Sequence, residues 1–309
     1  MANCLLKPWP IVSFTNEYDF QLAFQTSETL GWIKEDKSIQ RYFTEEKHLT
    51  VEGFQRLLKL VPSNVIHIFQ NLKELTVKNC GSLVEVFESH GVDAKEIHAM
   101  IHYKLEALNL YFLPKLIHLW KNYGGVLGFQ KLRILKVQHC GNLCSLFSPS
   151  IARSLVQLRH LRVYSCHMME EITTKEDEES EGSNNAKIVF PFLNKLELRY
   201  VPNLKCFCSG TFNIDLPSCE EMIIEKCPNM TTFCYGSVTT PKLLRIYKGS
   251  YEYVDIMGDL NMTIFYANES LKVHTFSICN HIKGHDKNFA FLSELLPFPK
   301  IRFIKCSIS

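Results

Sequence analysis

The stretch Phe129–Leu146 reads FQKLRILKVQHCGNLCSL, and its apolar residues fall at fixed offsets from Phe129. With Phe129 counted as 0, offsets +3, +6, +8, +11, +14 and +17 are Leu132, Leu135, Val137, Cys140, Leu143 and Leu146. Six copies of this pattern start at Phe69, His102, Phe129, Leu155, Phe190 and Leu216, with spacings of 33, 27, 26, 35 and 26 residues. One amphipathic helix cannot produce recurrence over such distances, so the pattern indicates a repeat architecture.

Two offsets decide the fold class. The +6 and +8 residues are two apart, so on a short strand they point to the same face. Stacked copies place these strands side by side in parallel and bury that face. The pattern therefore predicts an α/β fold of the leucine-rich-repeat type. We expect a solenoid with a curved parallel β-sheet on its concave face and short helical or irregular segments on its convex face.

The +11 position is cysteine in four of the six copies. These residues are Cys80, Cys140, Cys166 and Cys227. A free cysteine behaves as a small apolar side chain with a weak donor, which suits a tight buried turn. Two residues separate this cysteine from the next apolar residue, as in Cys140–Leu143. That spacing indicates a cysteine-containing subtype of the repeat.

We divide the chain into three parts. Residues 1–68 are expected to be an irregular region with degenerate repeat material, in which 54–60 form one helical or repeat-like turn. Residues 69–235 hold six repeats, and residues 236–309 hold degenerate repeats and a C-terminal cap. An acidic surface loop at 175–185 and a shorter insertion at 94–101 account for the two long spacings. Late strands are expected near Val273–Ile278 and Ile301–Cys306.

The composition is typical of a folded protein, and the net charge gives no indication of a strongly charged partner. The 309 residues are 46% hydrophobic and 21% charged, with a formal net charge of +2. That charge favours neither nucleic acid nor an anionic membrane as a partner. The opening Met1–Pro8 lacks the layout of a signal peptide, and no apolar run reaches the length of a membrane helix. With cysteines on the repeat positions of a core, we expect reduced thiols and a cytoplasmic location.

The order of motifs resembles the carboxy-terminal repeats of plant disease-resistance receptors of the coiled-coil, nucleotide-binding, leucine-rich-repeat class. The resemblance rests on Phe129–Leu143, on the continuation Leu146–Leu158, and on Met169–Ile172 followed by an acidic loop and Phe190–Leu196. The variants Leu113–Leu116 and Val201–Leu204, with proline second, also match. The resemblance covers residues 54–235 well and the remainder loosely.

The resemblance implies a non-enzymatic protein–protein interaction module in the defence response. A phosphate-binding Gly-x-x-x-x-Gly-Lys-Ser/Thr loop is missing from the sequence, so we expect a repeat-only chain, either a fragment or the product of a truncated gene. Family partners would be a pathogen effector, a guarded host protein or the receptor's own nucleotide-binding domain. No cofactor, nucleic acid or membrane is expected to bind.

Residues at +7 and +9 alternate with the buried +6 and +8 residues, so we expect them on the exposed concave face. In chain order the +7 residues are Thr76, Asn109, Lys136, Arg162, Glu197 and Ile223, and the +9 residues are Lys78, Tyr111, Gln138, Tyr164, Arg199 and Glu225. Tyr and Arg dominate binding hot spots. The candidate partner-binding residues are Lys78, Tyr111, Lys136, Arg162, Tyr164 and Arg199, facing an acidic protein or an acidic segment of the same receptor. The alternative is an ordinary solvated sheet face.

Four other functions receive less support. Five cysteines crowd into residues 206–234, namely Cys206, Cys208, Cys219, Cys227 and Cys234, but none forms a Cys-x-x-Cys pair, so we expect no metal site. His139 beside Cys140 is not expected to be catalytic, because neighbours at a strand end point apart. A ubiquitin-ligase adaptor would carry an F-box helix pair, and residues 1–68 show no convincing one. A secreted repeat receptor would carry a signal peptide and capping cysteines.

Overall fold

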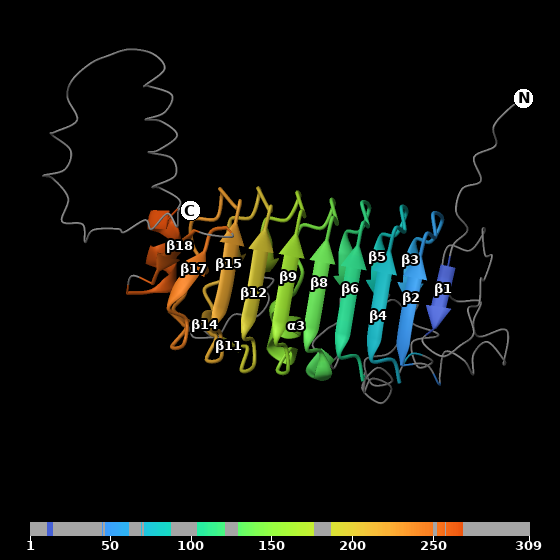
Figure 1. Ribbon diagram of the computed structural model, residues 1–309, viewed down its shortest axis with the longest axis horizontal. Coiled ribbons are helices and arrows are strands. Elements are labelled where there is room, and N and C mark those ends of the chain that lie inside the picture. Colours follow the sequence, from blue (N-terminus) through green and yellow to red (C-terminus); the bar gives the residue numbers. More distant parts are fainter. Residues whose placement is uncertain are drawn as a thin grey trace, which may run out of the picture.

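A computed structural model describes residues 11–14, 45, 47–61, 69, 71–87, 104–120, 129–175, 187–249, 252–256 and 258–267. The described chain winds into a right-to-left stack of similar coils, with one large sheet along its length (Figure 1). The expected late strands, the insertion at 94–101 and nearly all of the acidic loop lie outside the described residues.

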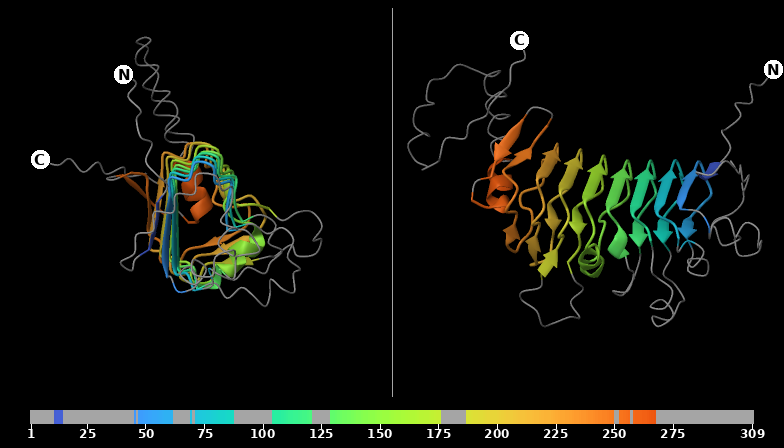
Figure 2. Two further views of the ribbon diagram at one scale, coloured as in Figure 1. Left: turned by 90° about the vertical axis from the view of Figure 1, so that its right-hand side faces the viewer. Right: turned by 60° about the horizontal axis from the view of Figure 1, so that its bottom comes forward.

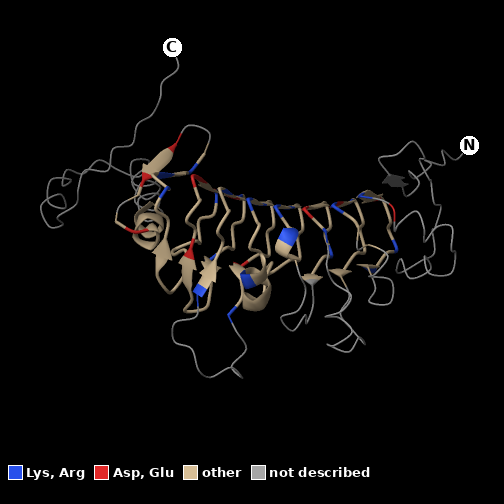
Figure 3. Ribbon diagram, turned by 90° about the horizontal axis from the view of Figure 1, so that it is seen from below, with Lys and Arg blue, Asp and Glu red and all other residues tan. Residues whose placement is uncertain are grey.

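The large sheet contains ten strands. In spatial order they are β1 (Ile11–Phe14), β2 (His48–Glu52), β4 (Glu74–Lys78), β6 (Ala107–Tyr111), β8 (Ile134–Gln138), β9 (His160–Tyr164), β12 (Lys195–Arg199), β15 (Glu221–Glu225), β17 (Arg245–Tyr247) and β18 (Tyr253–Asp255). Strands β2 to β17 are parallel, and each pairs +6 with +6 of the next copy, as Leu135 pairs with Leu161. The edge strands β1 and β18 are antiparallel to their neighbours. The predicted curved parallel sheet is confirmed, with its outer face on the concave side (Figure 3).

The other sides of the coil carry shorter elements. Three small parallel sheets are formed by β3 (Lys59–Val61), β5 (Glu85–Phe87) and β7 (His118–Trp120); by β10 (Glu171–Thr173) and β13 (Cys206–Cys208); and by β11 (Lys187–Val189), β14 (Asn213–Asp215) and β16 (Val238–Thr239). The helix α3 (Pro149–Ser154) and the 3-10 turn η3 (Phe129–Lys131) complete these sides. Seen along the axis, the copies superimpose as one outline around the core (Figure 2). Much of what was expected to be irregular is therefore short strand, because neighbouring copies pair their backbones here too.

The core contains the repeat positions named from the sequence. Every described side chain at +6 and +8 in the six copies is at most 3% exposed. Phenylalanine rings from successive copies pack on one another inside, with Phe207 and Phe233 stacked at 4.6 Å between ring centroids. The +11 cysteines are buried as expected, and the Sγ atom of Cys227 lies 3.5 Å from the carbonyl oxygens of both Leu198 and Glu225. Each of these thiols lies close to a backbone carbonyl of its own copy. Three of the four, all except Cys140, also lie close to a carbonyl of the preceding copy.

Two backbone turns repeat with the copies. The N–H at +14 donates to the C=O at +11 in all six copies, as Met230 does to Cys227 at 3.2 Å, which explains the two intervening residues. At +10, directly after each strand, the backbone is left-handed. These residues are Asn79, Phe112, His139, Ser165, Tyr200 and Lys226, with φ between 52° and 57°. In five of the six copies, from Asn79 to Tyr200, the N–H at +10 donates to the +9 carbonyl of the next copy, so the turn extends the ladder by one bond.

The sheet continues on both sides of the six copies. On one side Leu49, Val51 and Phe54 occupy +6, +8 and +11 of a further copy, whose +10 residue is Gly53 with φ of 80°. On the other side Ile246 pairs with Met222 at +6. A helical segment, 260–267, then lies within the outline of the solenoid at its end (Figure 2), with Leu260 and Ile264 buried. The proposed division at residues 68 and 235 stays a prediction.

Candidate functional site

The six candidate residues lie on the outer face of the large sheet. Lys136 and Arg162 occupy +7 of β8 and β9, where they are paired in register. Lys78, Tyr111, Tyr164 and Arg199 occupy +9 of β4, β6, β9 and β12. All six side chains are half-buried. Their role in binding stays a prediction.

The expectation that all +7 residues are exposed is wrong for three of them. Asn109, Glu197 and Ile223 are 7%, 4% and 5% exposed. They lie on the outer face, but the side chains around them leave little of their surface exposed. The Asn109 amide donates to the Glu74 carboxylate at 2.9 Å and to the Thr76 hydroxyl at 3.2 Å. A position on the outer face of the sheet therefore does not by itself leave a +7 side chain exposed.

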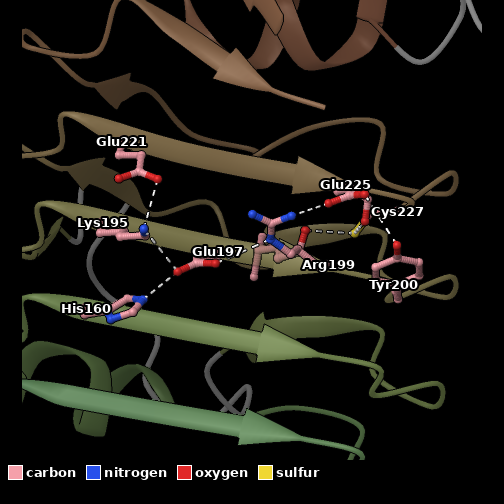
Figure 4. A network of polar contacts seen from close by, with 9 residues as sticks. His160, Lys195, Glu197, Arg199, Tyr200, Glu221, Glu225 and Cys227 are labelled. Atoms are coloured by element: carbon pink, nitrogen blue, oxygen red, sulfur yellow. Dashed lines mark hydrogen bonds and ion pairs between the residues drawn. The ribbon is translucent and has the colours of Figure 1, made fainter. Parts of the chain in front are cut away.

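Two of the six candidates already have carboxylate partners. Lys78 Nζ lies 2.7 Å from Glu52 Oε2 on β2. The Arg199 guanidinium donates to Glu225 on β15, and its Nε lies 3.4 Å from Glu197 Oε2 (Figure 4). Each carboxylate at +9, Glu52 and Glu225, belongs to the copy adjacent to its cation. Alignment of the copies carried this signal, because residues at one offset in neighbouring copies become cross-strand partners.

Glu197 is the centre of a polar network that spans β9, β12 and β15. His160 Nε2 and Lys195 Nζ lie 2.9 and 3.4 Å from Glu197 Oε1, and Lys195 also reaches Glu221 at 3.0 Å (Figure 4). Burial opposes ionisation of Glu197, but the Lys195 ammonium and the hydrogen bond from His160 keep the pKa of this carboxyl below its usual range. Burial lowers the pKa of His160, against the raising effect of Glu197. The Glu197 carboxylate is thus a structural anion surrounded by cations.

Lys136 and Arg162 form no ion pair within 4 Å among the described residues, although Arg162 is paired in register with Glu197 and helps to lower the pKa of that carboxyl. The guanidinium carbon of Arg162 lies 5.7 Å from the centre of the Tyr164 ring, within the range of a cation–π contact. Burial raises the pKa of Tyr111, and the nearby Arg162 opposes that shift. These two cations at +7, together with Tyr111 and Tyr164 at +9 of β6 and β9, form the part of the predicted patch that could accept an anion.

Charge changes sign along the outer face. At +5, +7 and +9, strands β6, β8, β9 and β12 carry four Lys or Arg side chains and one carboxylate. Strands β2 and β4 carry two carboxylates and one lysine, and β15 carries two carboxylates. The basic section is therefore bounded on one side by β2 and β4, which together carry one carboxylate more than lysine, and on the other side by β15. A long acidic tract would meet repulsion at either end, and only a short one matches the middle.

The cysteines are packing residues in the described part of the chain. All nine described cysteines are free thiols, and all but Cys144 are buried. Burial raises the pKa of Cys208 to about 11 and of Cys206 to about 12. Among the described residues no three His, Cys, Asp or Glu side chains are grouped closely enough to hold a metal ion. His139 faces outward while Cys140 is buried, as expected for neighbours at the end of a strand.

No described helix has the length and apolar character needed to cross a membrane. The described helices are α3, with six residues, and the segment 260–267.

The repeated coils, the parallel sheet and its polar outer face define a leucine-rich-repeat solenoid. The chain belongs to the family described as "Plant disease resistance protein RPS2-like, leucine-rich repeats", which matches residues 18–167 and 157–244. It is 25% identical over 253 residues to the "Probable disease resistance protein At4g27220" of Arabidopsis thaliana. The match covers 73% of this chain and 26% of that relative. The resemblance identified from the sequence is confirmed.

Proposed function

We propose that this chain is a protein–protein interaction module of plant defence, working as the effector-sensing or autoinhibitory repeat region of an immune receptor. The observation that carries the proposal is the pair Lys136 and Arg162 at the centre of the concave face, which form no ion pair among the described residues. Family membership supports the setting. The repeats are proposed to act by binding and not by catalysis.

The partner proposed is a protein with a short acidic segment, from a pathogen effector, a guarded host protein or the receptor's own nucleotide-binding domain. Tyr111 and Tyr164 beside the two cations supply the aromatic and cationic mixture typical of binding hot spots. Carboxylates outnumber cations on the outer face of β2 and β4 taken together and on that of β15, which favours an acidic segment confined to the strands between them. Binding is proposed to take place in the cytoplasm.

The test is a binding assay by biolayer interferometry against nucleotide-binding domains and effectors of this receptor class. In a partner that binds the intact chain, we expect the double variant Lys136→Glu, Arg162→Glu to weaken binding about tenfold or more, because two attractions become repulsions. Affinity of the intact chain should also fall as salt is raised.

The matched control is Lys115→Glu, Lys131→Glu, which makes the same change of charge at two exposed lysines away from the sheet face. It should bind as the intact chain does. Equal loss in both double variants would show a general effect of net charge, and no loss in either would refute the proposed surface.

A further inference from the structure

The +10 residues place aromatic rings along the carboxyl-terminal ends of the strands. Phe112 and Tyr200 hold the left-handed conformation with φ of 55°, which is disfavoured for bulky side chains. The turn itself does not require them, because Gly53 occupies the same offset in a neighbouring copy with φ of 80°. Phe112 is 52% exposed, so burial in the core does not account for its presence either.

These rings form one continuous surface, here called the aromatic rim. Its members are Phe112, His139, Tyr164 and Tyr200, from four consecutive strands. The rings of Phe112 and His139 are stacked at 4.5 Å, and Tyr164 lies 5.4 Å from His139 and 5.2 Å from Tyr200. Where the +10 residue is the small Ser165, the +9 residue Tyr164 fills the gap between its neighbours. The rim therefore continues across a copy that lacks a +10 ring.

Cations border the rim on the sheet face and at its end. The guanidinium carbon of Arg162 lies 5.7 Å from the Tyr164 ring centre, and Lys226 Nζ lies 5.6 Å from that of Tyr200. Neither side chain forms an ion pair among the described residues. The acid that touches the rim is Glu225, which accepts from the Tyr200 hydroxyl at 3.5 Å and is already bound to Arg199. The rim thus combines one exposed phenylalanine ring and three half-buried rings with the positive charge of Arg162 and Lys226.

We propose that the aromatic rim binds an extended acidic segment of a partner protein in which carboxylates alternate with aromatic or aliphatic side chains. This inference rests on the proposed function and names the chemistry of the partner. Apolar side chains of the segment would cover Phe112 and the neighbouring rings, releasing water from them. Its carboxylates would reach Lys136 and Arg162 on one side and Lys226 at the end. Rings held by their own neighbours lose little freedom on binding, which favours affinity.

The test uses fluorescent synthetic peptides of about twelve residues, the length range of extended recognition segments. Four compositions are compared, alternating Glu with Phe, Glu with Ser, Gln with Phe, and Lys with Phe. Fluorescence anisotropy with the full chain should show the Glu/Phe peptide bound about tenfold or more tightly than each of the others. The variant Phe112→Ser, Tyr200→Ser should lose about tenfold or more for Glu/Phe and little for Glu/Ser.

The matched control is Phe192→Ser, which removes a ring that is 45% exposed outside the rim. It should bind Glu/Phe as the intact chain does, and circular dichroism of all variants checks their folding. The proposed role of the rim is overturned if the Glu/Phe and Glu/Ser peptides bind equally, or if the variant Phe112→Ser, Tyr200→Ser binds as the intact chain does. The proposed function would still stand in that case if Lys136→Glu, Arg162→Glu weakens binding of the partner protein. Equal binding of Gln/Phe, no binding of any peptide, or self-association of the chain through the rim also overturns it.

Discussion

Six residues other than glycine hold the left-handed conformation directly after the strands, and this backbone geometry defines the repeat as much as the leucines do. The +10 N–H must turn to reach the +9 carbonyl of the next copy, as Ser165 does to Arg199 at 3.0 Å. A left-handed residue places its Cβ near a carbonyl oxygen, at a cost of about 1–2 kcal/mol. The hydrogen bond and the packing of the copies offset that cost.

Ser165 offers a clean measurement of this cost. Its side chain is small and half-buried, so a substitution changes the backbone preference more than the packing. We expect Ser165→Val to be less stable than Ser165→Gly by about 1–2 kcal/mol, since valine disfavours a positive φ and glycine does not. Urea unfolding followed by circular dichroism measures the difference. The control is Val156→Gly compared with the intact chain, at an exposed valine outside the +10 row, where glycine should bring no gain in stability. Equal stability of the two Ser165 variants would contradict the argument.

At the scale of strands, polar residues at one offset in neighbouring copies determine which charges are available. Lys195 and Glu221 both lie at +5, and Arg199 and Glu225 both lie at +9, so parallel register brings each pair together. The Glu197 carboxylate at +7 also lies within ion-pair distance of His160, Lys195 and Arg199. Three strands are thus connected by side chains as well as by backbone hydrogen bonds.

This network makes stability depend on pH. The pKa of Glu197 is depressed in the fold, so its contribution is present above its unfolded value and is lost as pH falls through the folded value. The depressed pKa of His160 acts in the same direction below about pH 6.5. The raised pKa of Lys195 affects stability only in the alkaline range. We expect the free energy of unfolding to decrease from about pH 7 to about pH 4.

Glu197→Gln tests that assignment. It should lower stability by about 1–2 kcal/mol at neutral pH, because a bond to a charged acceptor becomes a neutral one, and it should make the decrease toward acid shallower. Urea unfolding at a series of pH values gives both quantities. Glu220→Gln, at an exposed carboxylate that faces away from the network, is the control. A pH profile of Glu197→Gln parallel to that of the intact chain would refute the assignment.

At the scale of the whole molecule, a solenoid must close the ends of its core. The antiparallel strands β1 and β18 end the large sheet, and the segment 260–267 covers the C-terminal end. Asn261 fastens that segment, since its Oδ1 accepts from the backbone N–H groups of Phe233 and Cys234 at 2.9 and 3.1 Å. Its amide also donates to the carbonyl of Gly236 at 3.2 Å. In a chain of nearest-neighbour contacts, loss of an end is felt locally.

Asn261→Ala should therefore loosen one end of the solenoid. The backbone N–H groups of Phe233 and Cys234 would lose the side-chain oxygen that accepts their hydrogen bonds, which costs about 1–3 kcal/mol. Hydrogen exchange should accelerate in residues 232–236 and leave β4 to β9 protected. The control is Asn229→Ala, at an exposed asparagine of the preceding turn. Uniform acceleration along the chain would show that the end is not an independent unit, and no change would show that Asn261 does not fasten it.

The core was predictable from particular residues. Leu135, Val137 and Cys140 recur with equivalents in copy after copy, and a repeated environment selects the same kind of side chain each time. For the copy that contains β2, the sequence predicts only one helical or repeat-like turn beginning at Phe54. The apolar residues of this one copy resemble the repeat too weakly to predict the strand. The short strands on the other sides, such as β10 and β13, were missed, since three residues are too few to show a period.

The candidate surface was predictable in position and not in availability. Alternation along each strand placed Lys78, Lys136, Arg162 and Arg199 on the outer face, because successive side chains point to opposite sides. Whether such a cation is free depends on which carboxylate the adjacent copy brings within about 4 Å, and on the length of the side chains around it. The sequence alone thus determined the repeat, the parallel sheet and the buried positions, through recurrence of apolar residues. Only the tertiary structure determined that Lys78 and Arg199 each have a carboxylate partner, while Lys136 and Arg162 form no ion pair in the described chain. Only the tertiary structure also joined four rings into a rim. These outcomes depend on contacts between copies, which the sequence of one copy does not contain.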